Sequence, residues 1–302
     1  ILEVGDSHVK IGAENSGLLK SRKSVNFPTS QLSLPSITEK DNRDLLFGVT
    51  NEVDIIALSF VQNPDDIKRC RAMINALGSN IPIVAKIEKL SAVEQIDSIA
   101  ALADGLMVAR GDLGVECGVE KVPLFQRKIL AAGSEQAKPV IIATQMLESM
   151  IQSPQASPAE IADVANGVLE GADCVMLSAE VATGQQPTAC ISQMDSIIRE
   201  VEAWNYMKSS RSVNQLTNDR SWLGHEAIAI AACEAAEKVK ASAIICLTLT
   251  GSMAKLISSW RPTTPIIAIS PGKKVINSLG LVWGVSGMQN QLFYDTDVLL
   301  QD

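Results

Sequence analysis

The stretch IPIVAKIEKLSAVEQIDSIAALADGLMVARGD, residues 81–112, decides the fold class. It begins with a short apolar run, continues through a segment with helical periodicity, and returns to a second apolar run that ends in charged residues. Apolar runs without polar alternation are typical of strands that are buried on both faces. A strand, a helix and a second strand in this order predict a parallel β-α-β unit.

The same unit recurs along the chain. Further apolar runs occupy residues 54–60, 139–145 and 173–179, and predicted helices cover 63–77, 91–102, 123–137 and 157–171. Asn63 before Pro64 is expected to cap one helix, and Ser91 with Glu94 to form a capping box on the next. Units of roughly 25 to 35 residues predict an α/β fold of the (β/α)8 TIM barrel type. Five strands are predicted where a closed barrel needs eight, so we expect a partial barrel.

Composition excludes several classes of protein. The chain has 302 residues, a net charge of -8 and a pI near 5.0, which argues against a nucleic-acid partner. No apolar run reaches the ~20 residues that a membrane span needs. The six cysteines lie far apart without a CxxC motif, so neither a zinc site nor a disulfide framework is indicated. A cytoplasmic protein with no membrane partner is expected.

Polar side chains follow each apolar run and are expected to converge, because the carboxyl ends of barrel strands lie on one rim. They are Ser59, Lys86 with Glu88, Arg110 with Asp112, Thr144 and Ser178. Lys86 and Glu88 are two residues apart, so they leave the same face of a strand. Glu88 and Asp112 form an oxygen-ligand set suited to Mg²⁺. A single such charge is more often a solvated rim residue, and only the recurrence favours a site.

Four motifs carry a resemblance to a known family. They are AKIEK (85–89), MVARGDLGVE (107–116), KPVIIATQMLESM (138–150) and ADVANGVLEGADCVMLSAE (162–180). These motifs resemble those of the pyruvate kinases over most of the chain. The resemblance implies transfer of a phosphoryl group between phosphoenolpyruvate and ADP, which gives pyruvate and ATP in glycolysis.

The resemblance also implies a role for each matching residue. Lys86 matches the lysine that neutralises the transferring phosphoryl group and the enolate oxygen. Glu88 and Asp112 match the ligands of Mg²⁺, or of Mn²⁺ in its place. The backbone amides of Gly111 and Asp112 and the hydroxyl of Thr144 match the groups that hold the substrate carboxylate. Thr144 also matches a residue linked to protonation of the enolate.

Two further binding sites are implied less directly. Lys23 matches a lysine that reaches nucleotide phosphates, although by itself it reads as one charge on a solvated strand. Thr248, Thr250, Gly251 and Ser252 open a helix and suit an anion such as a sugar-phosphate effector, but hydroxyl residues also cap helices without any ligand. The family implies K⁺ as well, with its main ligands outside this sequence.

The resemblance divides the chain into three parts. Residues 1–34 are expected to form the end of a β-rich lid domain, 35–204 the second part of the catalytic barrel, and 205–302 an incomplete carboxyl-terminal α/β regulatory domain. The missing initiator Met and the five predicted strands suggest a piece of a longer protein, which the family implies is a homotetramer when full length.

Departures from the family pattern leave alternatives open. Ala179 and Val181 stand where the family usually has Gly and Thr, Thr183 replaces a frequently basic residue, and Ser24 replaces a Gly. They weaken the nucleotide prediction and leave the lysine and metal positions unchanged. One alternative is a metal-dependent barrel aldolase or lyase that acts on pyruvate or phosphoenolpyruvate. The other is a catalytically silent fragment or structural subunit.

Overall fold

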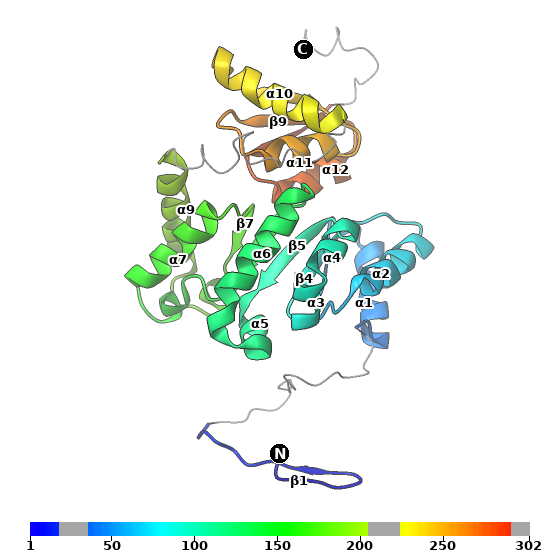
Figure 1. Ribbon diagram of the computed structural model, residues 1–302, viewed down its shortest axis with the longest axis vertical. Helices are drawn as coiled ribbons and strands as arrows, with labels where there is room; N and C mark the ends of the chain where they lie inside the picture. Colours follow the sequence, from blue (N-terminus) through cyan, green and yellow to red (C-terminus); the bar gives the residue numbers. More distant parts are fainter. Residues whose placement is uncertain (18–35, 205–223, 291–302) are drawn as a thin grey trace.

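The structure is a computed structural model that describes residues 1–17, 36–204 and 224–290. Its first element is an antiparallel pair of short strands, β1 (Glu3–Val4) and β2 (Val9–Lys10). Figure 1 shows this pair at the opposite end of the molecule from the carboxyl-terminal sheet. This pair lies within the predicted lid segment 1–34, of which residues 18–34 fall outside the described residues, so the bounds of that segment stay a prediction.

The central feature is a parallel sheet of five strands in the order β3-β4-β5-β6-β7. The strands are β3 (Ile56–Leu58), β4 (Ile83–Ile87), β5 (Gly105–Ala109), β6 (Val140–Ala143) and β7 (Cys174–Met176). Neighbours in sequence are neighbours in the sheet, as in a (β/α)8 barrel. The two edge strands, β3 and β7, are shorter than predicted, because among the described residues each pairs with a neighbour on one side alone.

Helices cover the outer face of this sheet (Figure 1). They are α1 (Glu39–Thr50), α2 (Pro64–Ala76), α3 (Leu90–Glu94), α4 (Ile96–Leu102), α5 (Arg110–Cys117), α6 (Val122–Glu135), α7 (Pro158–Leu169), α8 (Ala179–Ala182) and α9 (Pro187–Ala203), with short 3-10 turns η1 (Val119–Lys121) and η2 (Glu148–Ile151). Ile87, Leu106 and Ile142 point outward into this core and are fully buried. Alternate residues, such as Val84 and Met107, line the inner face.

One of the two predicted helix caps is confirmed. Asn63 accepts hydrogen bonds from the amides of Asp65 and Asp66 at the start of α2. The capping box predicted at Ser91 is wrong, because α3 begins at Leu90 and its N-cap is Lys89. Burial of Ala92 and Val93 sets where this helix lies, and tertiary packing here outweighs the local capping preference.

The carboxyl-terminal part forms a second parallel sheet in the order β10-β9-β8. Its elements are α10 (Gly224–Val239), β8 (Ile244–Leu247), α11 (Ser252–Ser259), β9 (Ile266–Ser270), α12 (Lys273–Ser278), η5 (Leu279–Leu281) and β10 (Val285–Gln289). It has its own core, which includes Ile257, Ile266 and Ala268. The predicted partial barrel and the predicted α/β part are therefore both confirmed, and β10 is an addition that the sequence did not indicate.

The two parallel sheets meet at the amino end of β7. Arg261 bonds Asp173 at 3.0 Å and the carbonyl of Gly171 at 2.5 Å, and both charged side chains are 8% exposed. The Arg261 guanidinium also lies 5.1 Å from the ring centre of Trp283. We call this junction the seam. Among the described residues, no helix is both long enough and apolar enough to span a bilayer.

Candidate active site

Lys86 and Glu88 lie side by side at the carboxyl end of β4. The Lys86 Nζ is 2.7 Å from Glu88 Oε1 and 2.8 Å from the hydroxyl of Ser59, which follows β3. The Lys86 side chain is 25% exposed, whereas that of Glu88 is 1% exposed. The prediction that the two side chains leave the same face of the strand is confirmed. A partly exposed ammonium therefore lies beside a buried carboxylate.

Glu88 is fixed by a second contact. Its Oε2 accepts a hydrogen bond of 2.8 Å from the backbone amide of Phe60. Phe60 has a φ of 54°, in the left-handed region that non-glycine residues rarely adopt. Together, the Lys86 and Phe60 contacts compensate the buried charge, as a buried carboxylate requires.

Gly111 and Asp112 lie in the first turn of α5, directly after β5. The sequence predicts them at the end of the second apolar run; in the structure β5 ends at Ala109 and the helix begins directly at Arg110. The positive end of the helix dipole is therefore at this rim, where it favours anions. Lys89 and Glu116 form an ion pair of 2.9 Å that holds α5 against the end of β4.

Thr144 follows β6 and meets α5 across the rim. The Gly111 amide donates to Thr144 Oγ1 at 3.0 Å, which leaves the hydroxyl hydrogen of Thr144 available to donate. The φ angle is 70° at Thr144 and 57° at Gln145, so two successive non-glycine residues are left-handed. Such strain is found where the surrounding structure determines the backbone, often at functional sites.

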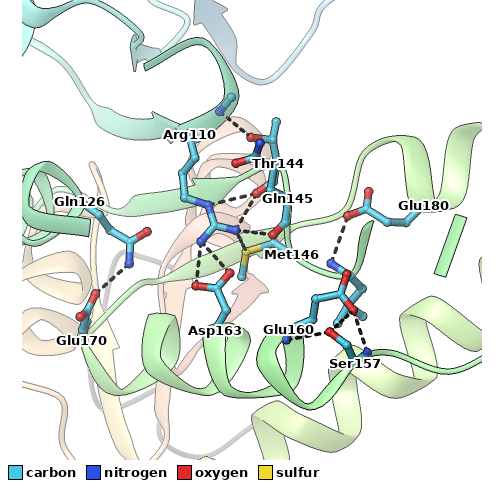
Figure 2. A network of polar contacts seen from close by, with 12 residues as sticks. Arg110, Gln126, Thr144, Gln145, Met146, Ser157, Glu160, Asp163, Glu170 and Glu180 are labelled. Carbon is cyan, nitrogen blue, oxygen red and sulfur yellow. Dashed lines mark hydrogen bonds and ion pairs between the residues drawn. The ribbon is translucent and has the colours of Figure 1, made fainter. Parts of the chain in front are cut away.

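Two buried residues that the sequence left without a role hold the turn after β6 (Figure 2). Arg110 bonds the carbonyls of Thr144 and Gln145. Glu180 accepts from the amides of Leu147, at 3.2 Å, and Ser178, at 2.8 Å. In the sequence, Arg110 is a charged residue at the end of a predicted strand. Glu180 lies between Ala179 and Val181, two residues that depart from the family pattern. Neither signal indicated a contact more than 30 positions away.

The carboxylates at this rim fit a hard divalent cation. Glu88 and Asp112 come from neighbouring strand ends, and Asp112 is exposed. Within the described part of the chain, no group of three or more His, Cys, Asp or Glu is arranged to hold a metal. Mg²⁺ uses one or two carboxylates and takes its other ligands from water and substrate, so two are sufficient.

The remaining predicted residues lie apart from this rim. Lys23 falls outside the described residues. In the second sheet, Thr248 Oγ1 accepts from the Gly251 amide at 2.9 Å, and the Thr250 and Ser252 hydroxyls are 2.8 Å apart. These hydroxyls make hydrogen bonds within the turn that precedes α11, and the binding of an anion there stays a prediction.

Comparison with known proteins agrees with this geometry. A family model described as pyruvate kinase, barrel domain, matches residues 1–191, and one described as pyruvate kinase, alpha/beta domain, matches residues 226–302. The chain belongs to the pyruvate kinase family. It is 41% identical over 290 residues to a pyruvate kinase of Clostridium acetobutylicum. The aligned region covers 95% of this chain and 60% of that relative. It is 43% identical over 289 residues to human pyruvate kinase PKLR, covering 94% of this chain and 50% of the relative.

A solved structure gives the same result. It is described as a pyruvate kinase from Cryptosporidium parvum, and it matches with a TM-score of 0.87 at 39% identity. The match covers 91% of this chain and 57% of that structure. The chain thus spans about half the length of the pyruvate kinases it matches. Because all these relatives are pyruvate kinases, the aldolase or lyase alternative is not favoured.

Proposed function

We propose that the protein is a phosphotransferase that moves a phosphoryl group from phosphoenolpyruvate to ADP, giving pyruvate and ATP. The observation that carries the proposal is the paired Lys86 and Glu88 at the end of β4, beside Asp112 and Thr144 on the same rim. The cation and the hydroxyl donor complement the negative charges of a phosphorylated carboxylic acid, and the two carboxylates would hold a divalent cation beside it. Membership of the pyruvate kinase family supports this substrate class.

Lys86 has the catalytic role in this proposal. Its ammonium is partly exposed and held by Ser59 and Glu88, so little reorganisation is needed when negative charge develops on the phosphoryl group and the enolate oxygen. Preorganised cations of this kind stabilise a transition state more than a ground state. Lys86 therefore contributes to the maximal rate.

Thr144 and the first turn of α5 orient the substrate carboxylate. The free hydroxyl hydrogen of Thr144 and the amide of Asp112 supply donors at a helix N-terminus. The Gly111 amide also becomes a donor to the substrate carboxylate when it gives up its hydrogen bond to Thr144 Oγ1. In this proposal the Thr144 hydroxyl also assists protonation of the enolate.

Glu88 and Asp112 would hold Mg²⁺ or Mn²⁺. The ion, when bound, polarises phosphoryl and carboxylate oxygens as a Lewis acid. The family uses a divalent metal and potassium, and we extend K⁺ dependence to this protein.

The wider proposal follows the family. It includes nucleotide contact through Lys23, a homotetramer, a cytoplasmic location and a division at residues 1–34, 35–204 and 205–302. It also includes a sugar-phosphate effector at Thr248, Thr250, Gly251 and Ser252, which would have to compete with the hydrogen bonds these residues make with one another.

The test is a lactate-dehydrogenase-coupled assay on the full-length protein with phosphoenolpyruvate, Mg²⁺ and K⁺. Pyruvate formation that requires ADP is the expected result. Pyruvate release without ADP would instead indicate a phosphatase or lyase. No turnover in a folded protein would favour the catalytically silent alternative.

A further inference from the structure

All the hydrogen-bonding capacity of Arg110 is used inside the protein. Its Nε and Nη2 donate to the Thr144 carbonyl at 3.1 and 2.7 Å, and Nη2 also reaches the Gln145 carbonyl at 2.7 Å and Met146 Sδ at 2.9 Å. Its Nη1 contacts both carboxylate oxygens of Asp163, at 2.9 and 2.7 Å. The side chain is 8% exposed. Figure 2 shows the guanidinium between the turn after β6 and the Asp163 carboxylate of α7.

The turn that Arg110 holds is strained. Thr144 and Gln145 are both left-handed, and a β-branched residue such as Thr is an outlier there. This conformation persists only if the contacts around it determine it. The carbonyls that Arg110 binds belong to these two residues. Glu180 fixes the far end of the same turn through the Leu147 amide.

We propose that Arg110 is a positioning residue, which acts on the reaction through Thr144 by holding the turn that aims the Thr144 hydroxyl across the rim. The inference rests on the proposed function. Arg110 has no donor left for a ligand, so its effect must pass through the residues it binds. Asp163 neutralises the guanidinium and is the anchor on α7.

Lysine cannot replace Arg110 in this arrangement. An ammonium is a compact charge without the planar fork, so it cannot bind two successive carbonyls and a carboxylate in this geometry. Arg110→Lys keeps the charge but should release the turn. A displacement of the reacting geometry by about 1 Å can lower a rate by about 100-fold, so we expect kcat to fall by about 10- to 100-fold.

The test is a double-mutant cycle in the full-length protein with Arg110→Lys, Thr144→Ala and the double variant. If Arg110 acts through Thr144, Arg110→Lys should lower kcat by less than about threefold in the Thr144→Ala background, because the hydroxyl it positions is already gone. If the two single losses of kcat instead multiply in the double variant, the inference is overturned and the proposed function remains intact. Wild-type protein without ADP-dependent turnover would overturn both.

Arg261→Lys is the matched control. Arg261 is also 8% exposed and also binds a carboxylate and a backbone carbonyl, but it lies at the amino end of β7, away from the rim. It should lower the melting temperature as Arg110→Lys does and leave kcat unchanged. An equal loss of kcat in both variants would mean that Arg110 is merely structural. If Arg110→Lys does not fold, Asp163→Asn takes its place, with the same pattern expected in the cycle.

Discussion

At the residue scale, the site depends on how a buried charge is compensated. Glu88 is almost fully buried and is bonded by Lys86 and by the Phe60 amide. The same carboxylate that would bind a cation therefore also orients the lysine. Lys86 and Glu88 act as a unit, and a change at either residue is expected to alter the other.

The Lys86→Met variant tests the catalytic role of the ammonium. It should lower kcat by at least about 1000-fold, because a preorganised charge contributes several kcal/mol in the transition state. The KM for phosphoenolpyruvate should change far less, since the interaction is strongest after charge has developed. Steady-state kinetics on the full-length protein measure both. Near-normal turnover would remove Lys86 from the mechanism.

Burial also decides the chemistry of Cys117, the cysteine of α5. Cys117 lies in the last turn of α5, and its thiol donates to the Leu113 carbonyl at 2.9 Å. Burial raises the pKa of this thiol, against the effect of nearby Lys121. Cys117 is therefore a packed thiol rather than a nucleophile.

At the element scale, α7 anchors the site because it carries Asp163. Its start is a capping box: Ser157 accepts from the Glu160 amide, and Glu160 accepts from Ser157. Glu160 also receives hydrogen bonds from the amide and hydroxyl of Ser149. Partial burial acts to raise the pKa of Glu160, but the hydrogen bonds from Ser149 and Ser157 together lower it.

This capping box makes a pH-dependent contribution to stability. A carboxylate with a lowered pKa stabilises the fold above its usual value of 4.5, and this contribution is lost as the pH falls through the lowered pKa. Glu160→Gln should therefore destabilise the protein at pH 7 and approach wild-type stability in acid. Ser157→Ala should cost about 1 kcal/mol. Urea unfolding at several pH values measures the free energy of unfolding of both variants. The Glu148→Gln variant, at an exposed residue, is the control.

The sequence predicts elements better than it predicts contacts between them. The five strands of the first sheet and the helices α2, α3, α4, α6 and α7 follow from local periodicity, and the same-face placement of Lys86 and Glu88 follows from the period of a strand. The sequence did not predict β10, α1 or α9. The contacts of Arg110 with Thr144 and of Leu147 with Glu180 join residues more than 30 positions apart. They depend on tertiary packing and strained backbone, which no local pattern encodes.

At the scale of the whole molecule, the seam joins the two parallel sheets through one buried ion pair. Arg261→Met should leave Asp173 buried without its cation, which costs about 3 to 5 kcal/mol. Calorimetry should then resolve separate transitions for the two sheets if the seam couples them. Arg199→Met, at an exposed pair with Asp195, is the control and should change little. A single unshifted transition in Arg261→Met would show that the pair does not couple the sheets.

The central claim is that the strand ends of the first sheet form one site for a divalent metal and phosphoenolpyruvate. The most direct test is calorimetric titration of phosphoenolpyruvate into the full-length protein with and without Mn²⁺, in wild type, Glu88→Gln and Asp112→Asn, with exposed Glu135→Gln as the control. We predict that binding is at least about tenfold tighter with Mn²⁺ in wild type and in the control, and that both rim variants lose this gain. Binding that is equal with and without the metal, or a gain that survives in both rim variants, would contradict the account.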